Sequence, residues 1–135
     1  MGVNLGELID PEEITFDDLN DRVIAIDAMN TLYQFLSIIR QRDGTPLKDS
    51  DGNITSHLSG LFYRNINLLE ENIRPVYVFD GAMPDLKQKE SSERRRKREE
   101  AKEEWEKLKE EGKISEAYSK ATQSSKLTGE MIEES

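Results

Sequence analysis

The 135-residue chain contains no cysteine, and this absence excludes disulfide scaffolds, thiol nucleophiles and cysteine-ligated zinc or iron–sulfur sites. Long apolar runs are missing too: none approaches the roughly 20 residues that a membrane-spanning helix needs, and no apolar secretory segment follows Met1. The chain also lacks an excess of positive charge, because its formal net charge is −9. Since nonspecific affinity for nucleic acid comes from surplus Lys and Arg, this total argues against a general polyanion-binding protein.

The charge is unevenly distributed along the chain. Residues 1–86 hold 6 basic and 15 acidic residues, whereas residues 87–135 hold 13 of each. Apolar residues number 37 in the first segment and only 10 in the second. We therefore expect residues 1–86 to form a small core, marginal by itself at this size, and residues 87–135 to be charged and mostly solvated.

Two short apolar runs that lead into an aspartate predict two β-strands. The first is Val23–Asp27, and the second is Pro75–Gly81, which contains Asp80. Both runs are rich in Val, Ile and aromatic residues and do not alternate with polar ones. This pattern is typical of strands covered on both faces, and it predicts a parallel sheet.

Apolar residues recur at helical spacing between the two strands. They predict a helix with Met29, Leu32, Tyr33, Leu36 and Ile39 on one face, and a second with Leu58, Leu61, Phe62, Ile66 and Leu69, preceded by Thr55 or Ser56 as N-cap. Residues 43–55 contain two Asp-Gly pairs and a proline, which favour a small hairpin. The order strand–helix–hairpin–helix–strand predicts an α/β fold with right-handed crossovers.

From Leu86 onward the pattern stays helical but becomes polar. A single helix over residues 86–111 would place Lys87, Ser91, Arg94 and Arg98 on one face, and Arg94–Arg98 is the only dense basic run of the chain. Pairs such as Arg95–Glu99 and Arg96–Glu100 would support the helix by about 0.2–0.5 kcal/mol each. The segment is either an anion guide or a solvent-exposed charged helix, and disorder is a further alternative.

Asp27 and Asp80 each stand at the end of an expected strand. In open parallel sheets, ligands bind beyond the carboxyl ends of the strands, and two neighbouring carboxylates favour a divalent cation such as Mg²⁺. The alternative is that each aspartate only caps the segment that follows it. A haloacid-dehalogenase phosphatase would need a second Asp where this chain has Met29, and a receiver domain would need an early acidic pair and a later Lys that are not evident.

The two expected helices also carry polar faces. Tyr33, Ser37 and Arg40 share one face of the first helix, and the second helix carries a polar stripe made of His57, Gly60, Arg64 and Asn67. Gly60 costs about 1 kcal/mol relative to Ala in a helix, which is tolerable where a phosphate backbone must approach closely. An ordinary solvated face is the alternative, and we expect His57 to be a surface or capping residue without a catalytic role.

At these residues the sequence resembles the flap endonucleases, the structure-specific 5′ nucleases of the XPG superfamily, and particularly their archaeal members. The stretches that carry the resemblance are Met1–Val3, Ala25–Ala28 continuing to Tyr33–Leu36, Ile39–Gly44, Thr55–Leu58, Gly60–Arg64 and Pro75–Gly81. They span nearly all of residues 1–86 in the family's order. The resemblance implies a PIN-like 5′-nuclease parallel sheet flanked by helices and followed by a charged helical arch.

The resemblance also implies roles for individual residues. Asp27 and Asp80 match metal ligands, and Lys87 and Arg94 match the two basic catalytic residues at the base of the helical gateway. The residues that match DNA-contacting positions are Gly2, Tyr33, Arg40, Arg64 and Arg98. A complete site of this family holds two Mg²⁺ ions, for which Mn²⁺ can substitute, and hydrolyses a phosphodiester.

The family pattern further implies how the chain is organised. Residues 1–86 correspond to the N-terminal nuclease region, 87–125 to the charged gateway and arch, and 126–135 to the start of a further helix that Thr128 could cap. Where the family has two adjacent prolines, Met83-Pro84 keeps one. The family's further acidic segments, its potassium-binding duplex grip and its sliding-clamp peptide have no match within the 135 residues.

We therefore expect the N-terminal part of a Mg²⁺-dependent 5′ flap endonuclease and 5′–3′ exonuclease of DNA replication and repair, incompetent by itself. Such a piece would be a fragment, a split-gene product or a truncated frame, cytoplasmic in an archaeon and nuclear in a eukaryote. One alternative is a nucleic-acid- or partner-binding module without catalysis, acting through the 87–111 helix. Another is a small PIN-like ribonuclease, for which only Glu7 and Glu70 are loose candidates as extra acids.

Overall fold

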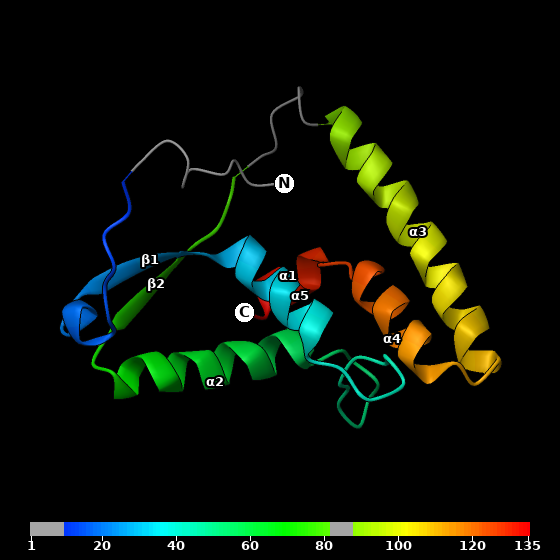
Figure 1. Ribbon diagram of the computed structural model, residues 1–135, viewed down its shortest axis with the longest axis horizontal. Coiled ribbons are helices and arrows are strands. Elements are labelled where there is room, and N and C mark those ends of the chain that lie inside the picture. The colour runs from blue at the N-terminus through cyan, green and yellow to red at the C-terminus, as the bar shows by residue number, and fades with distance from the viewer. Residues whose placement is uncertain (1–9, 82–87) are drawn as a thin grey trace.

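The computed structural model describes residues 10–81 and 88–135, without the side chains of residues 88–92. The elements follow in the order η2 (Asp17–Leu19), β1 (Val23–Asp27), α1 (Ala28–Ile38), α2 (Ser56–Glu70), β2 (Arg74–Val78), α3 (Gln88–Glu110), α4 (Ile114–Gln123) and α5 (Gly129–Glu133). In Figure 1 the two strands lie at one end of the molecule, α1 and α2 extend from them, and the α3/α4 hairpin forms the other end. The expected α/β order is confirmed.

β1 and β2 pair in parallel, as the two apolar runs predict. Their register joins Val23 to Arg74 and Asp27 to Val78. The expectation that both faces of the strands are covered is wrong for the described part of the chain, because exposed and half-buried residues alternate along both strands. α1 and α2 pack on the sheet, whereas Val76 and Val78 remain 49% and 53% exposed.

α1 is the central helix of the small core. Its residues Ala28, Leu32 and Leu36 are buried, at the spacing that the apolar pattern predicts. Helix α2 departs from its pattern: Phe62 and Leu69 of the expected apolar face are largely exposed. The buried face of α2 is instead formed by its small and polar residues Ser56, His57 and Gly60.

The polar stripe expected on α2 is therefore wrong at two of its four positions. His57 is fully buried rather than superficial, and Gly60 is buried against α1. A Cβ on Gly60 would lie only 2.6 Å from Cδ1 of Phe35 and 2.7 Å from Cδ1 of Ile39. The missing side chain thus lets two helices approach closely, which the polar spacing alone did not indicate. Arg64 and Asn67 are exposed, as expected.

The connection between α1 and α2 contains the turn-rich segment. Two isolated antiparallel bridges, Arg40 with Pro46 and Lys48 with Ile54, confirm a small hairpin-like loop. Thr55 occupies the N-cap position of α2 but makes no side-chain cap bond. The Ser56 hydroxyl instead donates to the Ile39 carbonyl at 2.6 Å, and it accepts from the Leu47 amide at 2.9 Å.

α3 and α4 form an antiparallel hairpin, so the single long helix expected over 86–111 is confirmed over Gln88–Glu110. The two helices pack through small buried residues, Ala101 on α3 and Ala117 and Ala121 on α4. The expected pairs Arg95–Glu99 and Arg96–Glu100 form at 3.2 and 3.1 Å. Since each is exposed, each adds only a few tenths of a kcal/mol, on the order of 0.3–0.5.

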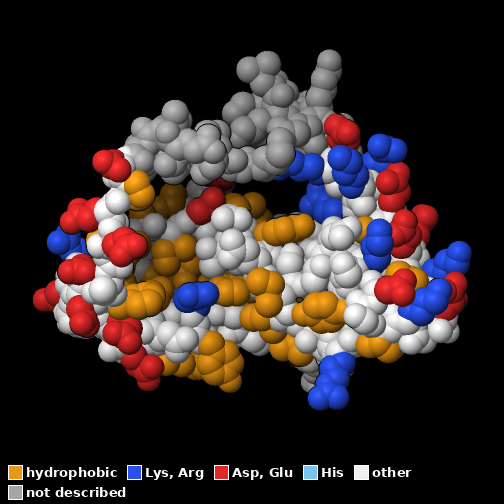
Figure 2. Space-filling view, in the orientation of Figure 1, with side chains coloured by type: hydrophobic (Ala, Val, Ile, Leu, Met, Phe, Trp, Pro, Cys, Tyr) orange, Lys and Arg blue, Asp and Glu red, His pale blue; other side chains and the backbone are white. Residues whose placement is uncertain are grey.

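The surface reflects the uneven charge of the sequence. Figure 2 shows Lys and Arg side chains over α3 interspersed with Asp and Glu, mostly acidic side chains around the sheet end, and apolar patches between the two. The last short helix, α5, begins after Thr128, whose hydroxyl accepts from the Met131 amide at 3.3 Å, as the expected cap requires. Within the described residues, no helix is both long and apolar enough to cross a bilayer.

Candidate functional site

Asp27 and Asp80 lie at the same edge of the sheet. Asp27 is the last residue of β1 and pairs with Val78 of β2. Asp80 comes two residues after Val78. Because the strands are parallel, both carboxylates belong to the carboxyl edge, where ligands of open α/β sheets bind. Both residues are exposed to solvent.

Asp27 also caps α1, so the alternative role suggested by its sequence position is confirmed. Its Oδ1 accepts a hydrogen bond from the Asn30 amide at 2.9 Å. This bond occupies one carboxylate oxygen. The second oxygen has no hydrogen-bond or ion-pair partner in the described part of the chain, so capping and metal binding are compatible at this residue.

The donor set at this edge fits part of a magnesium centre. Mg²⁺ takes hard oxygen ligands, commonly one or two carboxylates completed by water and substrate phosphate, and Asp27 and Asp80 are of that kind. Among residues 10–81 and 88–135, however, no three or more His, Asp or Glu side chains come together as a metal-binding group.

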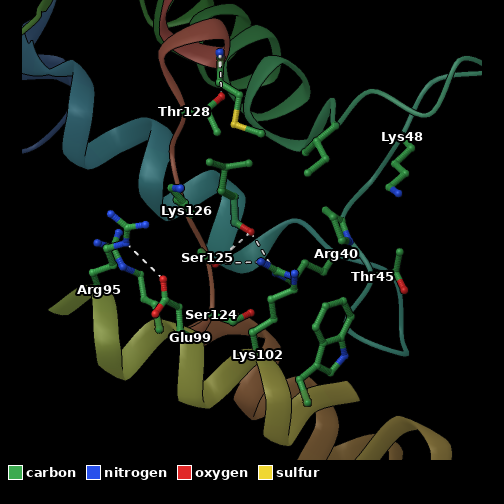
Figure 3. A pocket seen from close by; sticks show the side chains of 16 residues that line it. Arg40, Thr45, Lys48, Arg95, Glu99, Lys102, Ser124, Ser125, Lys126 and Thr128 are labelled. Carbon is green, nitrogen blue, oxygen red and sulfur yellow. Dashed lines mark hydrogen bonds and ion pairs between the residues drawn. The ribbon is translucent and has the colours of Figure 1, made fainter. Parts of the chain in front are cut away.

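A second feature is a cavity of about 630 Å³ beside α3. Its walls come from the α1–α2 connection, from one face of α3 and from residues 124–131. Figure 3 shows side chains from these three segments converging on it. Six of the lining residues are basic, namely Arg40, Lys48, Arg95, Arg98, Lys102 and Lys126. We call this cavity the cationic pocket.

The cationic pocket combines this charge with an apolar part. Among the described side chains that line it, Glu99 is the one acid, and it is paired with Arg95 at 3.2 Å. Lys102 is paired with Glu106, which does not line the pocket, at 3.9 Å. Leu36, Ile54 and Met131 contribute apolar surface. A site with five further cations and an apolar wall suits an anionic ligand that also carries a flat or apolar group, as a nucleotide does.

Arg40 lines this pocket. It does not lie on the face of α1 that its spacing from Tyr33 predicts. α1 ends at Ile38, so Arg40 lies in the following connection. Its guanidinium donates to the carbonyls of Leu36 at 2.9 Å and Gly44 at 2.7 Å, and to the Ser125 hydroxyl at 2.8 Å. Burial lowers the pKa of Arg40, although an arginine stays charged at any physiological pH. Arg40 therefore ties three segments together and gives the pocket a fixed charge.

The structure brings together only some of the residues that the sequence singled out. Arg40 and Arg98 both line the cationic pocket. Arg94 is exposed on α3, where its carbonyl accepts from the Arg98 Nε at 3.3 Å. Tyr33 is half-buried on α1, near enough to Arg40 to influence its pKa, but it does not line the pocket.

The remaining candidates lie elsewhere. Arg64 is exposed on α2, on the side of Tyr77 of β2, and is not part of the pocket wall. Gly2 and Lys87 lie outside the described residues, as does Glu7. Glu70 ends α2 and is exposed.

Sequence inspection missed four of the basic lining residues. Arg95 and Lys102 stand three residues before and four residues after Arg98, so helical spacing from Arg98 itself identifies them. Lys48 and Lys126 lie on segments far apart in the chain, and only the fold brings them to the same cavity.

His57 is the most unusual titratable group. Its ring is completely buried, and neither nitrogen has a hydrogen-bond partner among the described residues. The nearest carboxylate is Glu134, whose Oε2 lies 3.7 Å from Nε2. Burial lowers the pKa of His57 although Glu134 opposes this shift, so the neutral ring is favoured.

Comparison with known proteins gives consistent matches. The sequence profile of the XPG N-terminal domain matches residues 1–101. Flap endonuclease 1 of Pyrococcus furiosus is 55% identical over 134 residues, which are 99% of this chain and 39% of that protein. Flap endonuclease 1 of Methanobrevibacter smithii is 54% identical over 135 residues, covering all of this chain and 41% of the relative.

Solved structures agree with these sequence matches. Flap endonuclease-1 from Methanococcus jannaschii superposes with a TM-score of 0.59 at 42% identity, over 98% of this chain and 42% of that one. The catalytic core of Rad2 in complex with a DNA substrate superposes with a TM-score of 0.52 at 31% identity, over 88% and 28% of the two chains. The chain thus spans about two-fifths of the length of the flap endonucleases that it matches.

Proposed function

The chain belongs to the XPG N-terminal domain family, and on that premise we propose that it is the amino-terminal part of a structure-specific 5′ flap endonuclease and 5′–3′ exonuclease. Its substrate is DNA with a 5′ flap or branch, and its role lies in replication and repair, including Okazaki-fragment maturation and base excision repair. The observation that carries the proposal is the cationic pocket between the α1–α2 connection, α3 and residues 124–131. The two aspartates at the carboxyl edge of the sheet, which are not part of the pocket wall, support it separately.

The cationic pocket explains how an acidic chain would bind DNA. Phosphate affinity depends on the cations at the contact surface, not on the net charge of the whole protein. Here Arg98 and Lys102 of α3 face Arg40 and Lys48 of the α1–α2 connection across one cavity. A single strand needs cations for its phosphates and an apolar surface for its bases, and this cavity has both.

The carboxylate edge supplies the part of the site that binds metal. We propose that Asp27 and Asp80 bind Mg²⁺, that Mn²⁺ substitutes for it, and that a complete site holds two ions. Held by Asp27 and Asp80, Mg²⁺ would supply charge stabilisation at the phosphodiester and a bound water of lowered pKa. Because Asp27 caps α1, its carboxylate is fixed relative to β1 before any ion binds.

Basic residues near the start of α3 complete the proposed site. Lys87 and Arg94 stabilise negative charge that develops on the phosphoryl oxygens, a role for which fixed cations are suited. Tyr33 and Arg64 contact DNA outside the pocket, and Gly2, which lies outside the described residues, is a further DNA-contacting residue. These assignments rest on the match of each residue to the family's motifs.

Removing single charges from α3 tests DNA binding. We compare Lys102→Gln, in the pocket wall, with Lys107→Gln, which removes the same charge from an exposed position of the same helix outside the pocket. Binding of a fluorescein-labelled 5′-flap oligonucleotide is followed by anisotropy over a range of salt concentrations. Lys102→Gln should reduce the slope of log K against log salt by about 0.7–0.9, as loss of one phosphate contact does, and Lys107→Gln should not. Equal slopes for both variants would contradict the proposed binding surface.

Substitution of Asp27 tests the metal role separately from folding. Asn caps helices about as well as Asp, so Asp27→Asn should keep the α1 cap while removing the carboxylate. We expect the 135-residue chain to bind flap DNA without cleaving it, and Mg²⁺ to strengthen that binding in the wild type but not in Asp27→Asn. Efficient cleavage by the chain, abolished by Asp80→Ala, would refute the expected incompetence.

A second function from a different class has one observation in its favour. The described residues contain a basic cavity but no group of three acids, which is the arrangement of a binding module without catalysis. In that case DNA affinity would depend on salt and on Arg94–Arg98 and would be indifferent to Mg²⁺ and to Asp27→Asn. The Mg²⁺ titration above therefore separates the two functions.

The proposal extends to partners and location. A sliding clamp is an expected partner of the full-length family. A cytoplasmic location follows for an archaeal protein, because its DNA is replicated there, and a nuclear one for a eukaryotic protein.

A further inference from the structure

The sharp turn at Asp43-Gly44 has a role that its sequence signature does not explain. Gly44 is buried and has a positive φ of 83°, and a Cβ there would lie 2.7 Å from Ala121 Cβ and 3.0 Å from Trp105 Nε1. The turn is thus pressed against both helices of the α3/α4 hairpin. Only glycine satisfies both the backbone conformation and this close approach.

Polar contacts hold the turn in this place. The Trp105 indole donates to the Asp43 carbonyl at 3.1 Å. The Lys109 ammonium pairs with Asp43 Oδ2 at 2.7 Å and donates to the Thr45 hydroxyl at 3.0 Å. The Asp43 carboxylate is itself oriented by the amide and hydroxyl of Thr45, at 2.9 and 2.8 Å.

These contacts are confined to one half of α3. Within residues 93–104, Glu104 pairs with Lys120 of α4, and pairs such as Arg95–Glu99 and Arg96–Glu100 stay inside the helix. Figure 1 shows the first half of α3 extending beyond α4. The Asp43-Gly44 turn therefore holds the last part of α3, and the basic residues of α3 that line the pocket precede these contacts in the chain.

We propose that Asp43, Gly44, Trp105 and Lys109 form a positioning anchor that fixes the α3 wall of the cationic pocket at a set distance from the α1–α2 connection. This inference deepens the proposed function and rests on it. The anchor residues act on nucleic acid through the placement of Arg98 and Lys102, not by carrying the main phosphate contacts. Without the anchor, the two walls separate, and fewer molecules hold the binding arrangement at any moment.

The lone tryptophan of the chain reports the anchor directly. Trp105 is half-buried, and its indole is hydrogen-bonded to the Asp43 carbonyl. The Lys109 ammonium lies 5.8 Å from its ring centroid. Lys109→Met should shift the Trp105 emission to the red and increase its quenching by acrylamide. Lys107→Met is the matched control, since it removes the same charge from the same last turn of α3, and Lys109→Arg should restore the wild-type spectrum.

Asp43→Asn separates positioning from simple electrostatics. This variant makes the protein one unit more positive, so charge alone predicts tighter binding of DNA. Loss of the anchor predicts the opposite, because apparent affinity falls with the fraction of binding-competent molecules, about fivefold if that fraction falls to a fifth. The probe is a fluorescein-labelled single-stranded oligothymidylate, with circular dichroism as a check that α3 remains helical.

The outcomes are distinct. A red shift in Asp43→Asn and Lys109→Met together with weaker oligothymidylate binding by Asp43→Asn supports the proposal. Unchanged emission, or unchanged or tighter binding despite a red shift, overturns it. If the wild type itself does not bind the oligothymidylate, the proposed function fails, while the emission of the variants still decides whether the anchor exists.

Discussion

Substitution of Gly60 by Ala distinguishes two explanations of this glycine. Its sequence position suggests space for an approaching phosphate backbone, whereas the structure buries it against α1. The new methyl group would contact Cγ and Cδ1 of Phe35 and lie 2.7 Å from Ile39 Cδ1. The Ile39 methyl is the end of a flexible side chain and can move, but the Phe35 ring has to shift as a unit.

The magnitude follows from two opposing effects. Ala is favoured over Gly within a helix by about 1 kcal/mol. Overpacking of this kind costs about 1–3 kcal/mol, and the severe overlap with a ring places the cost toward the upper end. We expect a net loss of about 1–2 kcal/mol in the free energy of unfolding. For a chain of this size that corresponds to a Tm lower by about 4–8 °C.

The assay is urea and thermal unfolding followed by circular dichroism, with Gly129→Ala as control. Gly129 begins α5 and has no positive φ. A Cβ at this position would have no described atom within 4 Å beyond its own chain neighbours and helix backbone, so Ala there should be neutral or slightly stabilising. A Gly60→Ala protein that is as stable as the wild type but binds DNA more weakly would refute the packing explanation. It would favour the explanation that Gly60 leaves space for a phosphate backbone.

Three further predictions concern single side chains. Asp27→Ala should lower the free energy of unfolding by about 1 kcal/mol through loss of the α1 cap, whereas Asp27→Asn should change it by less than about half as much, both measured in urea. Ser56→Ala should cost about 1–3 kcal/mol in the same assay, because the buried hydroxyl joins the Ile39 carbonyl to the Leu47 amide and its loss leaves both unpaired. Burial lowers the pKa of His57, so the unfolded chain binds a proton more readily, and the free energy of unfolding should fall as the pH drops through the ordinary value of 6.5. His57→Phe should weaken that dependence between pH 7.5 and 5.5, and an identical slope in both proteins would contradict the neutral, buried ring.

Much of the backbone could be predicted from local pattern. The two apolar runs, the periodicity of α1 and the charged stretch of α3 each depend on spacing within one segment, which the sequence displays directly. The strand-end position of Asp27 and Asp80 follows from the same runs once parallel pairing is assumed. Helical spacing from Arg98 along α3 identifies Arg95 and Lys102 as well, although the sequence analysis did not assign them to the site.

The predictions that were wrong concern contacts between segments. His57 and Gly60 lie on the more polar side of α2, yet that side is buried because α1 and α5 pack against it. Arg40 has helical spacing from Tyr33, but the chain leaves the helix at Ile38 and turns the guanidinium toward Ser125. A pattern within one helix does not indicate which face its neighbours will cover.

By itself, the sequence determined the two parallel strands, the helices α1, α2 and α3, and the separation of an acidic N-terminal region from a helix rich in cations, because each follows from local composition and periodicity. Only the tertiary structure decided that Arg40, Lys48, Arg98 and Lys126 surround one cavity, and that Asp43 and Gly44 anchor α3. Arg40 and Lys48 are at least 50 positions from Arg98 and Lys126, and Asp43 is 62 positions from Trp105. Their meeting depends on how closely the helices and the connection pack, which is a property of the folded core rather than of any one segment.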